Sequence, residues 1–213
     1  MRVPPLDLVP ADRTAVLLAH NPANPATGGI WRVDRERGTA ILKLLTPPQP
    51  EDGPQWPASD DPEHWNYWKR EALAYRTGFA TRAYAAGGIR APRLLDAVQR
   101  RDGSIALWLE DVAGVPGPAA TPDQLVDFAG RLGVAQRAWL DRPPAEEWLS
   151  RDWLRGYTTW RPYPEPIPWD HPVAVQAWPA PLRDDLRMLW ARREDLLAAA
   201  DRLPRTLCHH DVW

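Results

Sequence analysis

The first half of the chain alternates apolar and polar residues in short runs, and a period of two is typical of β-strands. In the run 105–109, the aliphatic side chains fall on one face, and Ala106 and Trp108 on the other. Tight turns at 36–38 and 101–103, each ending in glycine, predict hairpins. The predicted strands are 14–19, 30–34, 39–45, 91–99 and 104–110. The sequence therefore predicts an antiparallel sheet of these five strands.

Between the third and fourth predicted strands, the apolar period lengthens to about 3.6 residues, which is typical of an amphipathic helix. The stripe from 65 to 79 predicts a helix of about four to five turns that begins at Glu63. Asp60 and Asp61 are positioned to cap its start, and the glycine pair at 87–88 is expected to end it.

Beyond Gly117 the pattern predicts helices only. One amphipathic stripe runs from 125 to 139, a weaker one covers 148–157, and a long third one runs from 182 to 200. The segment 161–181 between the second and third stripes holds seven prolines, and we expect it to be a functional loop or lid.

Composition narrows the class of protein. The 213 residues are 44% hydrophobic, which is enough to bury a core. A net charge of -2 gives no indication of a broad basic face for nucleic acid. The single cysteine, Cys208, cannot form an internal disulfide, and the N-terminal residues hold neither a signal peptide nor a membrane span. We therefore expect a cytoplasmic protein that binds neither nucleic acid nor a membrane.

Lys43 is the most informative single residue. Only two of the 26 basic residues are lysines, and Lys43 lies in the middle of the apolar strand 39–45. Lysine offers a compact charge that suits phosphate oxygens. The alternative is a lysine on an edge strand that extends its amine to solvent.

Glu71 is the candidate partner of Lys43. It lies at the edge of the predicted helical stripe, where a carboxylate would face the sheet. The alternative is an ordinary surface glutamate beside Lys69 and Arg70.

The C-terminal residues 208–211 read Cys-His-His-Asp. Adjacent ligands in one extended segment do not all converge on one tetrahedral ion, which argues against a zinc site. A catalytic His–Asp pair for acyl transfer would lack a nucleophile elbow, because no G-x-S-x-G motif occurs. The other interpretation is a catalytic loop, in which Asp211 points at a substrate hydroxyl and His209 anchors the loop.

The order of these parts, from residue 14 to 213, resembles the aminoglycoside phosphotransferase and choline kinase group. It runs from Thr27-Gly28-Gly29 through Lys43 and Glu71 to Leu109-Glu110-Asp111-Val112-Ala113-Gly114 and His209-His210-Asp211. The resemblance implies an α+β, two-lobed protein-kinase-like fold, with an N-terminal lobe at 1–112 and a partial helical lobe at 113–213.

The resemblance also implies roles for individual residues. Lys43 would hold the α- and β-phosphates of ATP, and Glu71 would position Lys43 by an ion pair. Backbone groups of Glu110 and Val112 would bind adenine, with Leu109 behind the ring. Gly28 and Gly29 would lie in the phosphate loop, although that loop has no G-x-G-x-x-G. Asp211 would be the catalytic aspartate and His209 the histidine that anchors its loop.

In this family the Mg²⁺ ligands follow the catalytic aspartate, at positions that would lie beyond Trp213. We therefore interpret the sequence as the front portion of a longer protein, and expect these residues alone to turn over ATP poorly or not at all.

The predicted function is ATP-dependent phosphorylation of a hydroxyl on a small molecule, such as an aminoglycoside, choline or a sugar. An alternative is a non-catalytic nucleotide- or carbohydrate-binding module, and another is a zinc protein that uses Cys208, His209 and His210. Acidic and aromatic residues could form a wall for a cationic or sugar-like acceptor, or could be ordinary core and surface. They are Glu146, Glu147, Trp148, Asp152, Trp153, Glu165, Trp169 and Asp170.

Overall fold

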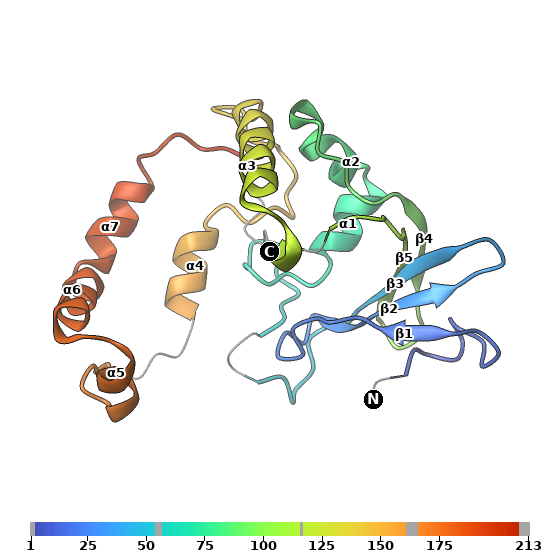
Figure 1. Cartoon of the computed structure of the whole chain (residues 1–213), viewed down its shortest axis with the longest axis horizontal. Coiled ribbons are helices and arrows are strands. Elements are labelled where there is room, and N and C mark those ends of the chain that lie inside the picture. Colours follow the sequence, from blue (N-terminus) through green and yellow to red (C-terminus); the bar gives the residue numbers. More distant parts are fainter. Residues whose placement is uncertain (1–2, 54–56, 116, 161–165, 209–213) are drawn as a thin grey trace. The chain divides into compact units, whose positions relative to one another are not determined.

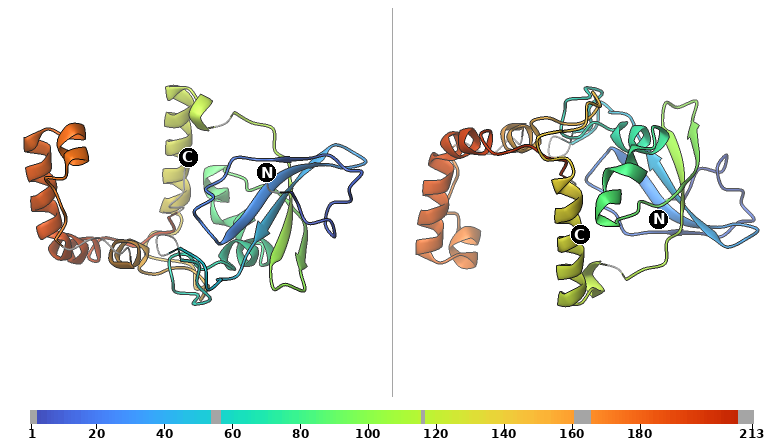
Figure 2. Two further views of the ribbon diagram at one scale, coloured as in Figure 1. Left: turned by 90° about the horizontal axis from the view of Figure 1, so that it is seen from below. Right: turned by 90° about the horizontal axis from the view of Figure 1, so that it is seen from above.

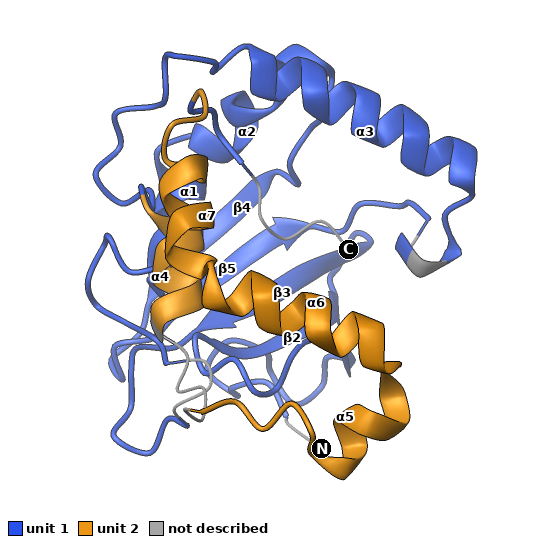
Figure 3. Ribbon diagram, turned by 90° about the vertical axis from the view of Figure 1, so that its left-hand side faces the viewer, with its two compact units in different colours: residues 1–151, 205–213 blue, residues 152–204 orange. Residues whose placement is uncertain are grey.

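The structure is a computed structural model that describes residues 3–53, 57–115, 117–160 and 166–208. The chain divides into two compact units, residues 1–151 with 205–213, and residues 152–204 (Figure 3). This division differs from the lobe boundary at residue 112, which stays a prediction. Each unit is described separately.

The first unit contains one antiparallel sheet in the order β1-β2-β3-β5-β4 (Figure 1). Its strands are β1 (Ala15–Leu17), β2 (Thr27–Asp34), β3 (Thr39–Leu45), β4 (Leu94–Gln99) and β5 (Ile105–Glu110). The predicted five-stranded sheet is thus confirmed. The turns that join its hairpins place Gly38 and Gly103 at φ of 76° and 84°, values that glycine adopts without steric cost.

One boundary was predicted wrongly. Thr27, Gly28 and Gly29 were expected in a loop, but they begin β2, and the pairing with β3 shifts by a bulge at Gly28. The glycines that suggested a loop are accommodated here by the bulge and by close packing on neighbouring side chains.

Each face of the sheet carries a cluster of buried residues. On one face, Leu45 and Leu107 pack with Trp68 and Ala72 of the α1 region, and Figures 1 and 2 show α1 against this side of the sheet. On the other face, Trp31 and other sheet residues pack with Val9 of the N-terminal segment. The continuous apolar run of β3 therefore belongs to a central strand that is covered on both sides.

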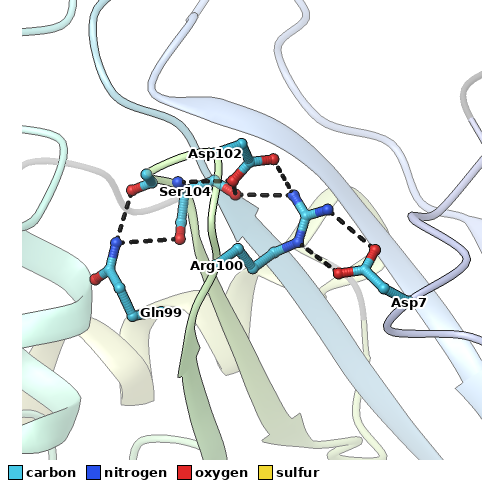
Figure 4. A network of polar contacts seen from close by, with 6 residues as sticks. Asp7, Gln99, Arg100, Asp102 and Ser104 are labelled. Atoms are coloured by element: carbon cyan, nitrogen blue, oxygen red, sulfur yellow. Dashed lines mark hydrogen bonds and ion pairs between the residues drawn. The ribbon is translucent and has the colours of Figure 1, made fainter.

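A polar network holds the N-terminal segment in place (Figure 4). The guanidinium of Arg100 donates from Nε and Nη2 to the carboxylate of Asp7, at 3.1 and 3.0 Å. The same guanidinium pairs with Asp102 and donates to Ser104 Oγ at 2.9 Å. These contacts attach the N-terminal segment to the β4–β5 turn, a role that the sequence did not predict.

The helix expected from Glu63 is wrong in its start and its continuity. The structure has α1 (Arg70–Arg76), α2 (Phe79–Ala83) and the 3₁₀-helix η1 (Ala85–Gly87). Gly78 adopts φ of 68° between α1 and α2, and this left-handed conformation interrupts the helix. Asp60 does not cap the helix, because its carboxylate accepts a 2.8 Å hydrogen bond from the Trp68 indole. Asp61 accepts from the backbone of Glu63 instead.

The helix predicted on the stripe 125–139 is confirmed as α3 (Pro122–Arg137), which follows the 3₁₀-helix η2 (Gly117–Ala119). Thr121 and Gln124 cap its start reciprocally. A Cβ on Gly87 would lie 2.0 Å from the Arg131 carbonyl oxygen, so glycine at this position allows α3 to pack closely on η1.

The second unit is helical, with α4 (Trp153–Trp160), α5 (Pro172–Ala177), α6 (Ala180–Ala191) and α7 (Arg193–Ala200). The long helix expected at 182–200 is divided at Arg192, and the segment expected as a loop contains α5. Arg155 joins α4 to α7 by ion pairs with Glu194 and Asp201, at 3.1 and 2.7 Å. Sheet and helices together make the protein α+β, as predicted. None of the described helices is both long enough and apolar enough to cross a membrane.

Candidate functional site

Lys43 and Glu71 form an ion pair in which Nζ lies 2.5 Å from Oε2. The strand register puts Lys43 opposite Ile30 of β2 and Leu107 of β5. Because β3 lies inside the sheet, the alternative of an edge-strand lysine is wrong. The pairing that the family resemblance implied is present.

Strand and helix periodicity explain how this pair forms. Side chains alternate along β3, so Lys43 points to the same face as Ile41 and Leu45. This face of the sheet packs against α1. On α1, Glu71 precedes the buried Ala72 and lies in the first turn, where a carboxylate interacts favourably with the helix dipole. Burial of Ala72 therefore brings the carboxylate against the sheet at the position of the amine.

The Lys43–Glu71 pair is only partly covered. The exposed fractions of the two side chains are 22% and 33%. An ammonium has three donor hydrogens, and a single carboxylate does not use all of them. The amine can thus bind a further anion, such as a phosphate oxygen, while Glu71 fixes its position.

Tyr75, one helical turn after Glu71, packs beside the sheet. Burial, together with the charge of Glu71, raises the pKa of Tyr75 to about 12. The phenol is therefore neutral around pH 7 and contributes no negative charge near Lys43.

The end of β5 leads from the sheet into an exposed linker. Leu109 is buried against the α1 face and lies opposite Ile41. Glu110 lies opposite Ala40, which is three residues before Lys43 and so about 10 Å from it along the strand. The Glu110 carboxylate pairs with Arg90 at 2.5 Å, and this hydrogen bond lowers the pKa of Glu110.

Val112 lies beyond the strand and is 44% exposed. Within the part of the chain that the structure describes, its backbone N–H makes no hydrogen bond. This amide is therefore available to a ligand, as its predicted role requires.

Close packing explains why glycine occupies positions 28 and 29. A Cβ on Gly29 would lie 2.2 Å from the indole ring of Trp31, and one on Gly28 would lie 2.9 Å from Cγ2 of Thr46. The indole of Trp31 is almost fully buried and fills the space beside Gly29. A phosphate-loop role for the two glycines stays a prediction.

The predicted catalytic residues, His209 and Asp211, lie outside the described residues. The segment that leads to them is anchored in the first unit, because Leu207 packs with Phe79 and Ala83. His210 also lies outside the described residues, so the zinc alternative is untested. Among the residues that are described, no three His, Cys, Asp or Glu side chains gather as they would around a metal ion.

Members of the suggested acceptor wall have partners within their own units. The Glu146 carboxylate pairs with Arg82, and the Trp148 ring meets the Phe79 ring edge-on at 5.2 Å. In the second unit, Asp170 accepts two hydrogen bonds from Arg187, each of 2.7 Å. These contacts favour the structural interpretation of these residues. Glu165 lies outside the described residues.

Sequence reasoning missed Arg70. Its guanidinium donates to the backbone carbonyls of Pro62, His64, Trp65 and Trp148 at 2.8–3.0 Å. Arg70 thereby ties the segment before α1 to the segment after α3. No sequence signal distinguishes it from the other arginines, because its acceptors are backbone atoms from two regions of the chain.

Asp111 was also missed as a site residue, although it lies between Glu110 and Val112. Its carboxylate accepts hydrogen bonds from Arg32 and Thr39. Its partners are more than 70 residues away in the chain, which is why the local sequence gives no sign of them.

Comparison with known proteins found no matching family model, no matching curated protein and no matching solved structure. The family resemblance therefore rests on the residues named above.

Proposed function

We propose that this protein is an ATP-dependent phosphotransferase that acts on a hydroxyl group of a small molecule, with a two-lobed protein-kinase-like fold. The observation that carries the proposal is the Lys43–Glu71 ion pair, with one of only two lysines in the chain on an inner strand.

The strand register supports a nucleotide that lies along β3. Its phosphates would meet the amine of Lys43, and its base would lie about 10 Å away at the linker that begins at Glu110. Ile41, which is half-buried and lies opposite the buried Leu109 on the same face, offers apolar surface to a purine ring. The exposed amide of Val112 offers a hydrogen-bond donor to the base.

Phosphoryl transfer depends on position and charge neutralisation, not on a covalent nucleophile. In this proposal Lys43 neutralises charge on the α- and β-phosphates, and Glu71 holds its amine in place. Asp211 orients the acceptor hydroxyl. The described residues form no carboxylate cluster that fits Mg²⁺, so we assign none of them to a metal.

An acyl-phosphate derivative of ATP tests the proposal directly. Such a reagent places an activated acyl group beside the phosphates, and a nearby lysine amine displaces ATP to form an amide. We expect labelling of Lys43 that excess ATP suppresses. Lys69, the second lysine, is the internal control, because its amine pairs with Asp60 at 3.3 Å on the surface. Equal labelling of both lysines, unaffected by ATP, would contradict the proposal.

A further inference from the structure

Asp111, the first residue after β5, is bound by two residues of the β2–β3 hairpin. Its carboxylate oxygens accept from Nε and Nη2 of Arg32 at 2.7 and 3.3 Å. The hydroxyl of Thr39 donates to the same carboxylate at 2.6 Å. The side chain of Asp111 is 14% exposed and that of Arg32 is 49% exposed, so the carboxylate is the better covered partner of this pair.

These partners lie on the face of the sheet that carries Lys43. Arg32 lies opposite Ile41 in the register, and Thr39 precedes Lys43 by an even number of residues. Arg32, Thr39 and Lys43 therefore project from the same side of one hairpin. Through Asp111, the linker is attached to the strands that carry the phosphate-binding lysine.

The linker has little other attachment to the sheet. Within the described residues, the backbone of 112–115 makes no hydrogen bond, and Val112 and Val115 are exposed. The hydrogen bonds from Arg32 and Thr39 lower the pKa of Asp111, because they favour the charged form of its carboxylate. Without the Asp111 side chain, the backbone just beyond Glu110 would be free to move relative to β3.

We propose that Asp111 is a positioning residue for the nucleobase. Its bonds to Arg32 and Thr39 fix the linker so that the backbone groups of Glu110 and Val112 meet the edge of the base while Lys43 meets the phosphates. This inference rests on the proposed function, and it adds a residue to which neither the motif order nor the ion pair assigns a role.

The experiment compares ATP with inorganic tripolyphosphate, which lacks the base. We expect Asp111→Asn to weaken ATP binding about tenfold, as the loss of a charge-assisted contact predicts, and to leave tripolyphosphate affinity within about twofold. A purely structural role would change both affinities together. Thr39→Val is a milder second variant that keeps the Arg32–Asp111 pair, and we expect about a threefold loss for ATP alone.

Asp7→Asn is the matched control. Asp7 forms a similar two-bond pair with Arg100, which attaches the N-terminal segment to the β4–β5 turn (Figure 4). We expect this variant to alter thermal stability and to leave the ratio of ATP to tripolyphosphate affinities unchanged. Isothermal titration calorimetry measures all of these affinities.

The outcomes separate the two proposals. If the unaltered chain binds ATP but Asp111→Asn keeps its affinity ratio, or if Asp7→Asn shifts the ratio equally, the role of Asp111 is wrong and the proposed function stands. If the unaltered chain binds neither ligand, the proposed function fails, and the role of Asp111 fails with it.

Discussion

The amine of Lys43 lies 2.5 Å from the carboxylate of Glu71, on the sheet face where Leu45 and Leu107 pack with Trp68. An apolar environment strengthens the attraction between opposite charges, but it also makes an unpaired charge costly. The two residues are therefore expected to depend on one another.

Replacing Lys43 tests its role in binding phosphate. We expect Lys43→Met to weaken ATP binding by about tenfold or more, because the variant removes the cation that faces the phosphates. Glu71→Gln, which keeps the shape of the side chain but removes the anchoring charge, is expected to cause a smaller loss. Calorimetric titration with ATP measures both.

Lys69→Met is the control for both variants, because it removes the other lysine of the chain from an exposed pair with Asp60. We expect its ATP affinity to stay within about twofold of the original, as is typical of surface ion pairs. An equal loss in Lys69→Met would mean that overall charge, and not the position of Lys43, determines binding.

Gly29→Ala tests whether this glycine is required by packing. Its new methyl group would meet the Trp31 ring, and overpacking of this kind costs about 1–3 kcal/mol of unfolding free energy. The loss should shrink in a Trp31→Phe background, where the ring is smaller. Urea unfolding of the single and double variants measures this coupling.

Gly130→Ala is the matched glycine control, because nothing lies within 4 Å of the position of its Cβ in helix α3. There alanine should stabilise the protein by about 0.5–1 kcal/mol, since it favours helix more than glycine does. Destabilisation of both glycine variants to the same extent would argue against the contact with Trp31.

Arg70 is expected to be critical for stability. Its guanidinium binds four backbone carbonyls, and burial lowers its pKa to about 10, so it still carries its charge at neutral pH. Arg70→Lys offers fewer donors in a different geometry and leaves carbonyls unsatisfied, which should cost about 2–4 kcal/mol. Chemical denaturation measures the change.

Arg76→Lys provides the comparison within the same helix. Arg76 donates one 3.3 Å hydrogen bond to the carbonyl of Ala97 at an exposed position, and its replacement should cost less than about 0.5 kcal/mol. Similar losses for Arg70→Lys and Arg76→Lys would show that the carbonyl contacts of Arg70 add little.

The sheet could be predicted because its signals are local. Alternation places the side chains of β5 on two faces, and glycines at 38 and 103 mark turns that require positive φ. The pairing of Lys43 with Glu71 followed from the same periodicities, one in a strand and the other in a helix, once the family resemblance suggested that they meet.

The predictions were wrong or incomplete where tertiary contacts determine the local structure. The apolar stripe 65–79 is compatible with one continuous helix, and only the left-handed conformation of Gly78 shows where it breaks. The burial of Val9 and the bonds of Arg70 and Asp111 depend on segments far apart in the chain, which no local pattern brings together.

His64 is expected to make the free energy of unfolding depend on pH. Burial lowers its pKa, and the charge of Arg70 lowers it further against the opposing effect of Asp61, so the folded protein resists protonation of this ring. The unfolded chain takes up the proton near the ordinary value of 6.5. Stability should therefore fall as the pH falls through 6.5, by at most about 1.4 kcal/mol per pH unit for this one group.

His64→Asn isolates this contribution. The Nδ1 atom of His64 accepts a hydrogen bond from the backbone N–H of Asn66, and an asparagine oxygen can accept the same bond without titrating. Melting curves at pH 7.5 and 5.5 should show a smaller difference in the variant than in the original chain. His171→Asn is the control, because His171 accepts the equivalent bond from Val173 at an exposed position. If both variants reduce the difference between the two melting temperatures equally, the burial of His64 does not cause the pH dependence.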